Sequence, residues 1–135
     1  MSGLCGWVGH GAGAADNRVL VEAMAAPLAR FDASPVHTAQ GSRSAAAVVA
    51  QPGSAHLHQQ DGLTVALWGD VRVRDAALAE QVAEQGLARV LAGRWRDGPQ
   101  AVCEALSGAF ALCIIDEAAG EALLAIGRAS CRERV

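Results

Sequence analysis

The sequence contains no lysine and no tyrosine, and its aromatic residues are three Trp and two Phe in 135 positions. All 11 basic residues are therefore arginines, which excludes a lysine nucleophile or a lysine Schiff base. The formal net charge of −3 gives no electrostatic reason to expect nucleic acid or an anionic membrane as a partner.

The four cysteines form no CxxC pair, and no His lies at metal-ligand spacing from them, so we predict no metal site. No apolar run approaches the ~20 residues of a membrane span, and no charged leader with an apolar core and a cleavage site precedes the domain. We therefore expect reduced thiols in a cytoplasmic protein. The cysteines are Cys5, Cys103, Cys113 and Cys131.

Hydrophobic patterning predicts a single α+β domain that is long enough to bury a core. Residues 110–115 are apolar on both faces, as in a central buried strand, and residues 31–43 are polar and irregular. Strands at both ends with helices between them suit layered packing. Further strands are predicted at residues 3–8, 45–50, 63–68 and 122–126, with a short strand or loop at 56–60.

Local signals also place the helices. Asp16 is predicted to cap a helix after a glycine-rich turn at 9–15, and Asp75 to cap a second helix that Gly86 breaks. Pro99 is predicted to stand in the first turn of a later helix. We expect the first helix to carry Leu20, Met24 and Leu28 on one face, with Pro27 disturbing its last turn.

The opening places one thiol almost at the amino terminus, because residues 4–9 read Leu-Cys-Gly-Trp-Val-Gly. If the chain began at Cys5, a free α-amino group with a pKa of about 8 would lie beside the sulfur and could act as its base. The alternative is that Cys5 is a small apolar residue in a first strand.

A second segment, Leu-Ser-Gly-Ala-Phe-Ala-Leu-Cys-Ile-Ile-Asp at residues 106–116, is followed after a turn by Glu-Ala-Leu-Leu-Ala-Ile-Gly-Arg at 121–128. Together with the opening, this resembles the amino-terminal domain of class II glutamine amidotransferases, particularly asparagine synthetase and its relatives. That family begins Met-Cys-Gly-Ile and closes the domain with a Leu-x-Gly-x-Phe-Ala strand and a hairpin. The resemblance covers nearly the whole chain in order and is close at its two ends.

The resemblance implies a four-layer αββα sandwich of two antiparallel sheets between helices, the amino-terminal nucleophile (Ntn) hydrolase fold. The first strand would lie centrally, beside the strand near residue 110, with the sulfur at the rim of a pocket. The amidotransferase-like domain would span residues 1–128 and be incomplete at its carboxyl end, with a non-matching tail at 129–135.

The resemblance also implies a reaction and a set of residues. Cys5 would attack the side-chain amide of glutamine and form a thioester, and the released ammonia would travel to an ATP-using domain. The backbone of Gly69 would contribute to the oxyanion hole. Arg30 and Asp70 would be the substrate-binding residues, although Arg30 is also interpretable as a solvated arginine at a helix end.

Several positions depart from the family pattern. Four residues precede Cys5, so its nitrogen is an amide unless residues 1–4 are removed. Trp68 stands where the family has the asparagine of its oxyanion hole. In residues 84–90 no acid stands at the place that holds the substrate ammonium, and Arg89 has the wrong charge for it.

No pyrophosphate-binding Ser-Gly-Gly-x-Asp loop is present, so ATP and Mg²⁺ are expected only in an absent synthetase domain, and no cofactor is expected here. We therefore predict a degenerate amidotransferase-like domain of an asparagine synthetase-related protein, a ligase family, which supports an ATP-dependent amide-forming domain or subunit. One alternative is an active glutaminase that binds glutamine and uses Cys5 after loss of residues 1–4. Another is a non-functional gene fragment.

Overall fold

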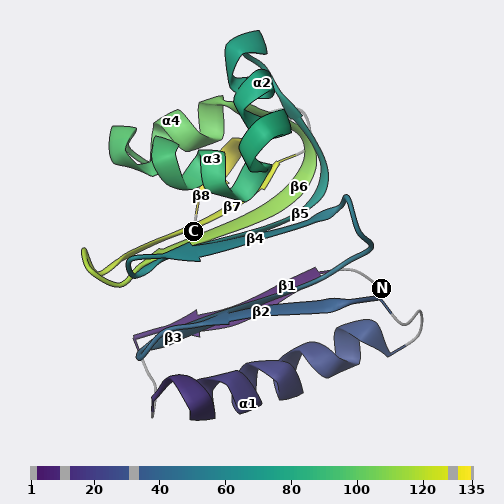
Figure 1. The fold of residues 1–135 in the computed structure, drawn as a ribbon, viewed down its shortest axis with the longest axis vertical. Helices are drawn as coiled ribbons and strands as arrows, with labels where there is room; N and C mark the ends of the chain where they lie inside the picture. The colour runs from purple at the N-terminus through teal and green to yellow at the C-terminus, as the bar shows by residue number, and fades with distance from the viewer. Residues whose placement is uncertain (1–2, 10–12, 31–33, 128–130, 135) are drawn as a thin grey trace.

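A computed structural model of the chain shows an α+β fold with two antiparallel sheets and four α-helices (Figure 1). One helix, α1, packs against the outer face of the smaller sheet, and α2, α3 and α4 pack against the outer face of the larger sheet. This arrangement is compatible with the predicted four-layer sandwich. The structure describes residues 3–9, 13–30, 34–127 and 131–134.

The two sheets, named A and B here, differ in size. Within the described residues, sheet A has three strands in the order β1-β3-β2, and sheet B has five in the order β4-β5-β6-β7-β8. Every neighbouring pair is antiparallel. The strands of sheet A are β1 (Gly3–Val8), β2 (Val36–Gln40) and β3 (Ser44–Val49). The strands of sheet B are β4 (Ala55–Gln60), β5 (Leu63–Val73), β6 (Leu106–Asp116), β7 (Glu121–Gly127) and β8 (Cys131–Arg134).

The helices and 3-10 turns connect these strands. No helix in the described part of the chain is long and apolar enough to cross a lipid bilayer. The helices are α1 (Ala14–Ala25), α2 (Ala76–Gln85), α3 (Leu87–Arg94) and α4 (Pro99–Glu104), and the 3-10 turns are η1 (Ala26–Ala29) and η2 (Trp95–Asp97).

Strand β3 is buried along its whole length and on both faces. Its odd-numbered residues Ala45, Ala47 and Val49 pack toward α1, whereas Ala46 and Val48 pack between the two sheets. Because side chains alternate along a strand, small residues on both faces let a helix and a second sheet approach the same strand closely. The predicted strand at 45–50 is confirmed, with bounds shifted by one residue.

Helix α1 presents a different face to the core than the sequence predicts. Its buried residues are Asn17, Val21 and Ala25, while Leu20 and Met24 are 49% and 40% exposed. The apolar face predicted to carry Leu20, Met24 and Leu28 is therefore not the face that α1 buries. Leu28 lies beyond the helix, in η1, where it packs against the cluster between α1 and β3. The alanine-rich surface of β3 accepts small side chains at close range, and Asn17 Nδ2 donates to the carbonyl oxygen of Gly41 at 2.8 Å, which fixes the rotation of the helix.

The start of α1 is also earlier than predicted. The helix begins at Ala14 with Gly13 as its N-cap residue, so Asp16 lies in the first turn and does not cap it. An acidic residue in the first turn still interacts favourably with the helix dipole. The predicted disturbance at Pro27 is confirmed, since α1 ends at Ala25 and a 3-10 turn containing this proline follows.

Three other local predictions are confirmed. Asp75 caps α2 by accepting a hydrogen bond from the backbone nitrogen of Ala77 at 3.0 Å. Gly86, with φ of 90°, separates α2 from α3, a conformation that few residues other than glycine adopt. Pro99 begins α4 directly after Gly98.

Two strands were not predicted from the sequence. Residues Val36–Gln40 form β2 within the segment expected to be irregular, and Cys131–Arg134 form β8 beside β7. Each lies at the edge of its sheet, where one side of the strand faces no neighbour and the hydrophobic alternation is weak. Strand β1 is correctly predicted at its bounds, but it lies at the edge of sheet A rather than centrally.

A carboxylate joins the two sheets at one end of the molecule. Glu117, in the turn after β6, accepts hydrogen bonds from the backbone nitrogen of Arg43 at 3.0 Å and from Ser44 Oγ at 2.5 Å. A Cβ on Gly41 would lie 2.5 Å from Glu117 Oε1, so glycine leaves the space that this carboxylate fills. The turn between β2 and β3 is thereby fastened to the turn between β6 and β7.

We expect Glu117→Ala to lower the free energy of unfolding by about 1–3 kcal/mol, because it leaves the buried Ser44 hydroxyl without this acceptor. Urea denaturation measures the change. Glu121→Ala, which removes an exposed carboxylate from the same hairpin, is the matched control. Equal effects of the two substitutions would show that the Glu117 hydrogen bonds do not stabilise the fold.

Candidate functional site

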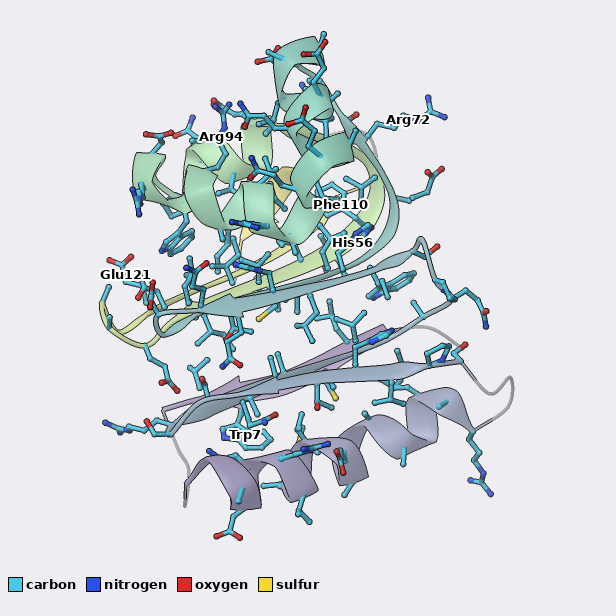
Figure 2. All side chains as sticks on the ribbon, viewed as in Figure 1. Trp7, His56, Arg72, Arg94, Phe110 and Glu121 are labelled. Carbon is cyan, nitrogen blue, oxygen red and sulfur yellow. The ribbon has the colours of Figure 1, made fainter. Side chains whose placement is uncertain are left out.

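Cys5 lies in the middle of β1, opposite Ala47 of β3, and is half-buried. Its side chain packs with Trp7 against the cluster between sheet A and α1, and Figure 2 shows Trp7 between these two layers. Leu4, one residue earlier, packs into the cluster between the two sheets. The thiol is therefore on the face of β1 that looks toward α1 and not toward sheet B.

Burial raises the pKa of the Cys5 thiol above its ordinary value. A nucleophilic cysteine needs the opposite, a lowered pKa or an adjacent base. The residues before it are part of the sheet, since Gly3 pairs with Val49 and Leu4 with Val48. Removing residues 1–4 would delete Gly3 and Leu4 from β1. Both pairings with β3 and the packing of Leu4 between the sheets would be lost.

Gly69 lies in β5, opposite Phe110 of β6, with φ of +132°. A side chain there would collide with the carbonyl oxygen of Ala109, so the close approach of β6 requires glycine. The backbone nitrogen of Gly69 already donates to the carbonyl oxygen of Ser54 at 3.0 Å. Before it could act as an oxyanion donor, this hydrogen bond would have to break.

Trp68 occupies part of the space between the sheets. Its half-buried indole packs against a cluster to which Leu4 of β1 and Cys113 of β6 also belong. The buried members of this cluster are Ala46, Val48, Ala50, Ala66 and Ile115.

The four predicted site residues do not lie together: Cys5 is in sheet A, Arg30 follows η1, and the other two are in sheet B. Arg30 is exposed at the end of η1, directly after Leu28 and Ala29, which pack against the same cluster as Cys5. Gly69 and the exposed Asp70 belong to sheet B. Sheet A separates the side-chain face of Cys5 from these two residues.

Residues 84–90 lie farther still from Cys5. They span the end of α2 and the start of α3, which cover the outer face of sheet B. Arg89 is exposed there and lines an open groove of about 420 Å³ together with His58 and Asp61. Two sheets therefore stand between Arg89 and the layer that holds the Cys5 side chain.

A polar contact that the sequence does not indicate lies in the wall of the groove that Arg89 lines. Trp95 Nε1 donates to Asp116 Oδ2 at 2.9 Å, and Asp116 Oδ1 accepts from the backbone nitrogen of Ala119 at 3.1 Å. The carboxylate thus holds η2 against the end of β6. No sequence pattern links these positions, because they are 21 residues apart and meet only through the fold.

A groove of about 330 Å³ runs along β1 and has Cys5 in its wall. Among the residues that the structure describes, its lining contains no charged side chain and no amide or hydroxyl side chain, whereas sites for small polar ligands have a few well-placed polar groups. Among the described residues, no group of three His, Cys, Asp or Glu side chains could hold a metal ion. The lining residues are Leu4, Cys5, Gly6, Trp7, Val8, Cys113, Ile115, Ala122, Leu123 and Leu124.

No protein-family model matches this chain, and no curated protein or solved structure matches it either.

We expect iodoacetamide to modify Cys5 in the folded protein at pH 8 more slowly, by about tenfold or more, than in the guanidinium-unfolded chain. The raised pKa leaves a smaller fraction of the Cys5 thiol as thiolate at pH 8. The difference in modification rate between the folded and the unfolded chain should therefore narrow as the pH rises. Peptide mass mapping follows the reaction. Cys113, whose pKa burial raises to about 11, serves as a slower internal reference. Faster modification of Cys5 in the folded protein would indicate an activated thiol.

Proposed function

We propose that this chain is an amidotransferase-like domain, related to the amino-terminal domain of asparagine synthetases, that has lost glutamine hydrolysis. It packs against an ATP-dependent amide-forming domain or subunit and helps to shape the active site of that partner. The amide nitrogen in such a system comes from the substrate's own amine, so selection on a glutaminase pocket is relaxed. ATP and Mg²⁺ belong to the partner, and the setting is cytoplasmic.

The observation that carries this proposal is the chemistry of the groove beside Cys5. Glutamine has a charged ammonium, a charged carboxylate and a side-chain amide, and a site for it needs groups that match all three. None of the described side chains that line the groove is charged or carries an amide or hydroxyl group. Burying a charged group there without a partner would be strongly unfavourable.

Three further observations support the loss of hydrolysis. The pKa of the Cys5 thiol is raised and its nitrogen is a peptide amide within β1. The backbone nitrogen of Gly69 is engaged with Ser54, and losing one oxyanion donor typically costs about 10²–10³ in rate. Trp68 fills space between the sheets where the family pattern has asparagine.

The arrangement of layers supports the relationship itself. Two stacked antiparallel sheets with helices on both outer faces are compatible with an Ntn-hydrolase-like sandwich. The segments that carry the resemblance, residues 3–8 and 106–116, form β1 and β6, and these strands pack across the layer boundary.

We expect the purified chain to release no more glutamate from glutamine than its Cys5→Ala variant does, because the groove lacks groups that bind the amino acid. A coupled glutamate assay makes the comparison, and the intact mass of the same sample shows where the chain begins. We expect a mass beginning at Met1 or Ser2. Glutamate release that depends on Cys5, in a sample whose mass begins at Cys5, would instead establish the active glutaminase.

The proposed role requires a partner domain or subunit that forms amides with ATP. We expect the gene downstream of codon 135, or an adjacent gene, to encode a domain with a Ser-Gly-Gly-x-Asp pyrophosphate loop. Reading the surrounding DNA sequence and co-purifying its product with this chain tests the expectation. A neighbourhood without such a domain, together with failure of this chain to bind one, would contradict the proposed role and favour a gene fragment.

A further inference from the structure

An open groove of about 420 Å³ lies between the helices and the end of sheet B where β4 turns into β5. Helix α3 packs over β4 and β5, as Figure 1 shows, so α3 and η2 form one wall of the groove and the sheet forms the other. This volume is in the range typical of sites for small molecules. Both sheets lie between this groove and the layer that holds the Cys5 side chain.

The groove has charges of both signs, and each sign has its own wall. The helical wall carries the guanidinium groups of Arg89 and Arg96. The sheet wall carries the carboxylates of Asp61, in the turn after β4, and of Asp116, at the end of β6. The other titratable side chain in the described lining is that of His58, on β4.

These opposite charges do not pair across the groove. Within the described part of the chain, neither the guanidinium of Arg89 nor that of Arg96 forms a hydrogen bond or a salt bridge, and the same holds for the carboxylate of Asp61. Two cationic groups and two anionic groups therefore line one open space and leave their charges available to a ligand.

The carboxylate of Asp116 is held in place from behind. Its Oδ2 accepts a hydrogen bond from Trp95 Nε1 at 2.9 Å, and its Oδ1 accepts from the backbone nitrogen of Ala119 at 3.1 Å. Trp95 is only 9% exposed. A carboxylate has about four lone-pair sites, so both oxygens can still accept a hydrogen bond from a ligand. Because this group is already ordered, it loses little freedom when it binds a cation.

Small residues separate the two arginines on the helical wall. Arg89, Ala92, Gly93 and Arg96 are spaced i, i+3, i+4 and i+7, so they share one side of the helix. A Cβ added to Gly93 would meet no atom within 4 Å outside its own helix, and Gly93 does not have a positive φ. Neither packing nor backbone conformation requires glycine there, although glycine is less favourable than alanine inside a helix. Its effect is to leave open space between the two guanidinium groups.

We propose that this groove binds a small zwitterion, a free amino acid or a short peptide. Its carboxylate lies between Arg89 and Arg96, and its ammonium group lies at Asp61 and Asp116. A guanidinium offers paired N–H donors that match a carboxylate, and a carboxylate accepts hydrogen bonds from an ammonium group. A ligand with only negative charge would meet two carboxylates, and one with only positive charge would meet two arginines. The inference does not depend on the proposed amidotransferase ancestry.

The probe is the dipeptide L-alanyl-L-alanine, titrated into the full ¹⁵N-labelled chain at pH 7 and constant ionic strength. At this pH its ammonium and carboxylate groups are both largely charged. The indole N–H resonance of Trp95 reports binding, because this N–H is bonded to the Asp116 carboxylate. We expect a dissociation constant of about 1 mM or lower. N-acetyl-Ala-Ala lacks the ammonium group and Ala-Ala-amide lacks the carboxylate, so each should bind about tenfold or more weakly.

The substitution Gly93→Leu tests the groove without removing a charge. The new side chain enters open space, and leucine favours a helix more than glycine does, so the protein should remain folded. Because leucine would occupy the space between the arginines, we expect binding of the dipeptide to weaken by about tenfold or more. Ala83→Leu, at an exposed position of α2 that does not line the groove, should bind like the unmodified chain.

The substitution Arg89→Gln tests the carboxylate contact. It removes one guanidinium and keeps a polar side chain, so binding of the dipeptide should weaken by about tenfold. Binding of Ala-Ala-amide, which has no carboxylate, should not change. Arg72→Gln is the matched control, since Arg72 is exposed at the end of β5 and lies apart from α3 (Figure 2).

Four results would overturn the proposal. They are no binding of the dipeptide at about 20 mM, equally tight binding of the doubly blocked N-acetyl-Ala-Ala-amide, equal effects of Gly93→Leu and Ala83→Leu, or equal effects of Arg89→Gln and Arg72→Gln. The doubly blocked peptide stands for an internal segment of a polypeptide. Its binding would therefore show that the groove accepts a continuation of the chain or a partner polypeptide instead of a zwitterion.

A parallel titration with free L-alanine distinguishes the two kinds of zwitterion. Tighter binding of alanine than of the dipeptide would assign the groove to free amino acids, and the opposite order would assign it to short peptides. Either order supports the proposal, provided that the blocked peptides bind more weakly.

Discussion

The fold depends on the burial of β3 between a helix and a second sheet. Three consecutive alanines, Ala45 to Ala47, followed by Val48 and Val49, give this strand two narrow apolar faces. One face receives Val21 and Ala25 of α1, and the other meets the inner face of β5. Larger residues on either face would hold the layers apart, since protein interiors are too closely packed to absorb extra volume without rearrangement. The position of every other element in sheet A follows from this strand.

The pairing of β1 with β3 also decides what Cys5 can do. Cys5 is opposite Ala47, whose side chain faces α1, so the thiol faces α1 as well. A shift of the register by one residue would reverse every side chain of β1 and direct the sulfur between the sheets. Leu4 and Trp68 fill the space between the sheets in the observed register. Packing and chemistry are therefore coupled, because the side chains that stabilise the contact between the sheets are those that leave no polar pocket there.

Local signals in the sequence predicted several local features, although Asp16 does not cap α1 as expected. Asp75, Gly86 and Pro99 act through their own backbone conformation or through neighbouring residues, and the structure confirms all three roles. The buried face of α1 could not be predicted in this way, because it depends on a hydrogen bond from Asn17 to Gly41, 24 residues away. Strand β2 was missed because it is polar and gains its regular structure from pairing with β3.

The arrangement of the candidate site could not be predicted from local sequence signals either. Cys5 and Gly69 were identified by motif, and a motif contains no information on which face of a sheet a side chain occupies. Gly69 has a structural reason to be glycine, since β6 passes too close for any side chain. That reason becomes visible only when Ala109 and Phe110 are placed opposite it.

Native-state hydrogen exchange tests the central claim most directly, namely that β3 joins the two sheets into one cooperative unit. If it does, the amides of Ala46 and Val48 in β3 exchange only through global unfolding, with the same free energy as Leu67 in β5. Exchange of the β3 amides at a clearly lower free energy, while Leu67 stays protected, would mean that sheet A opens separately and would contradict this account.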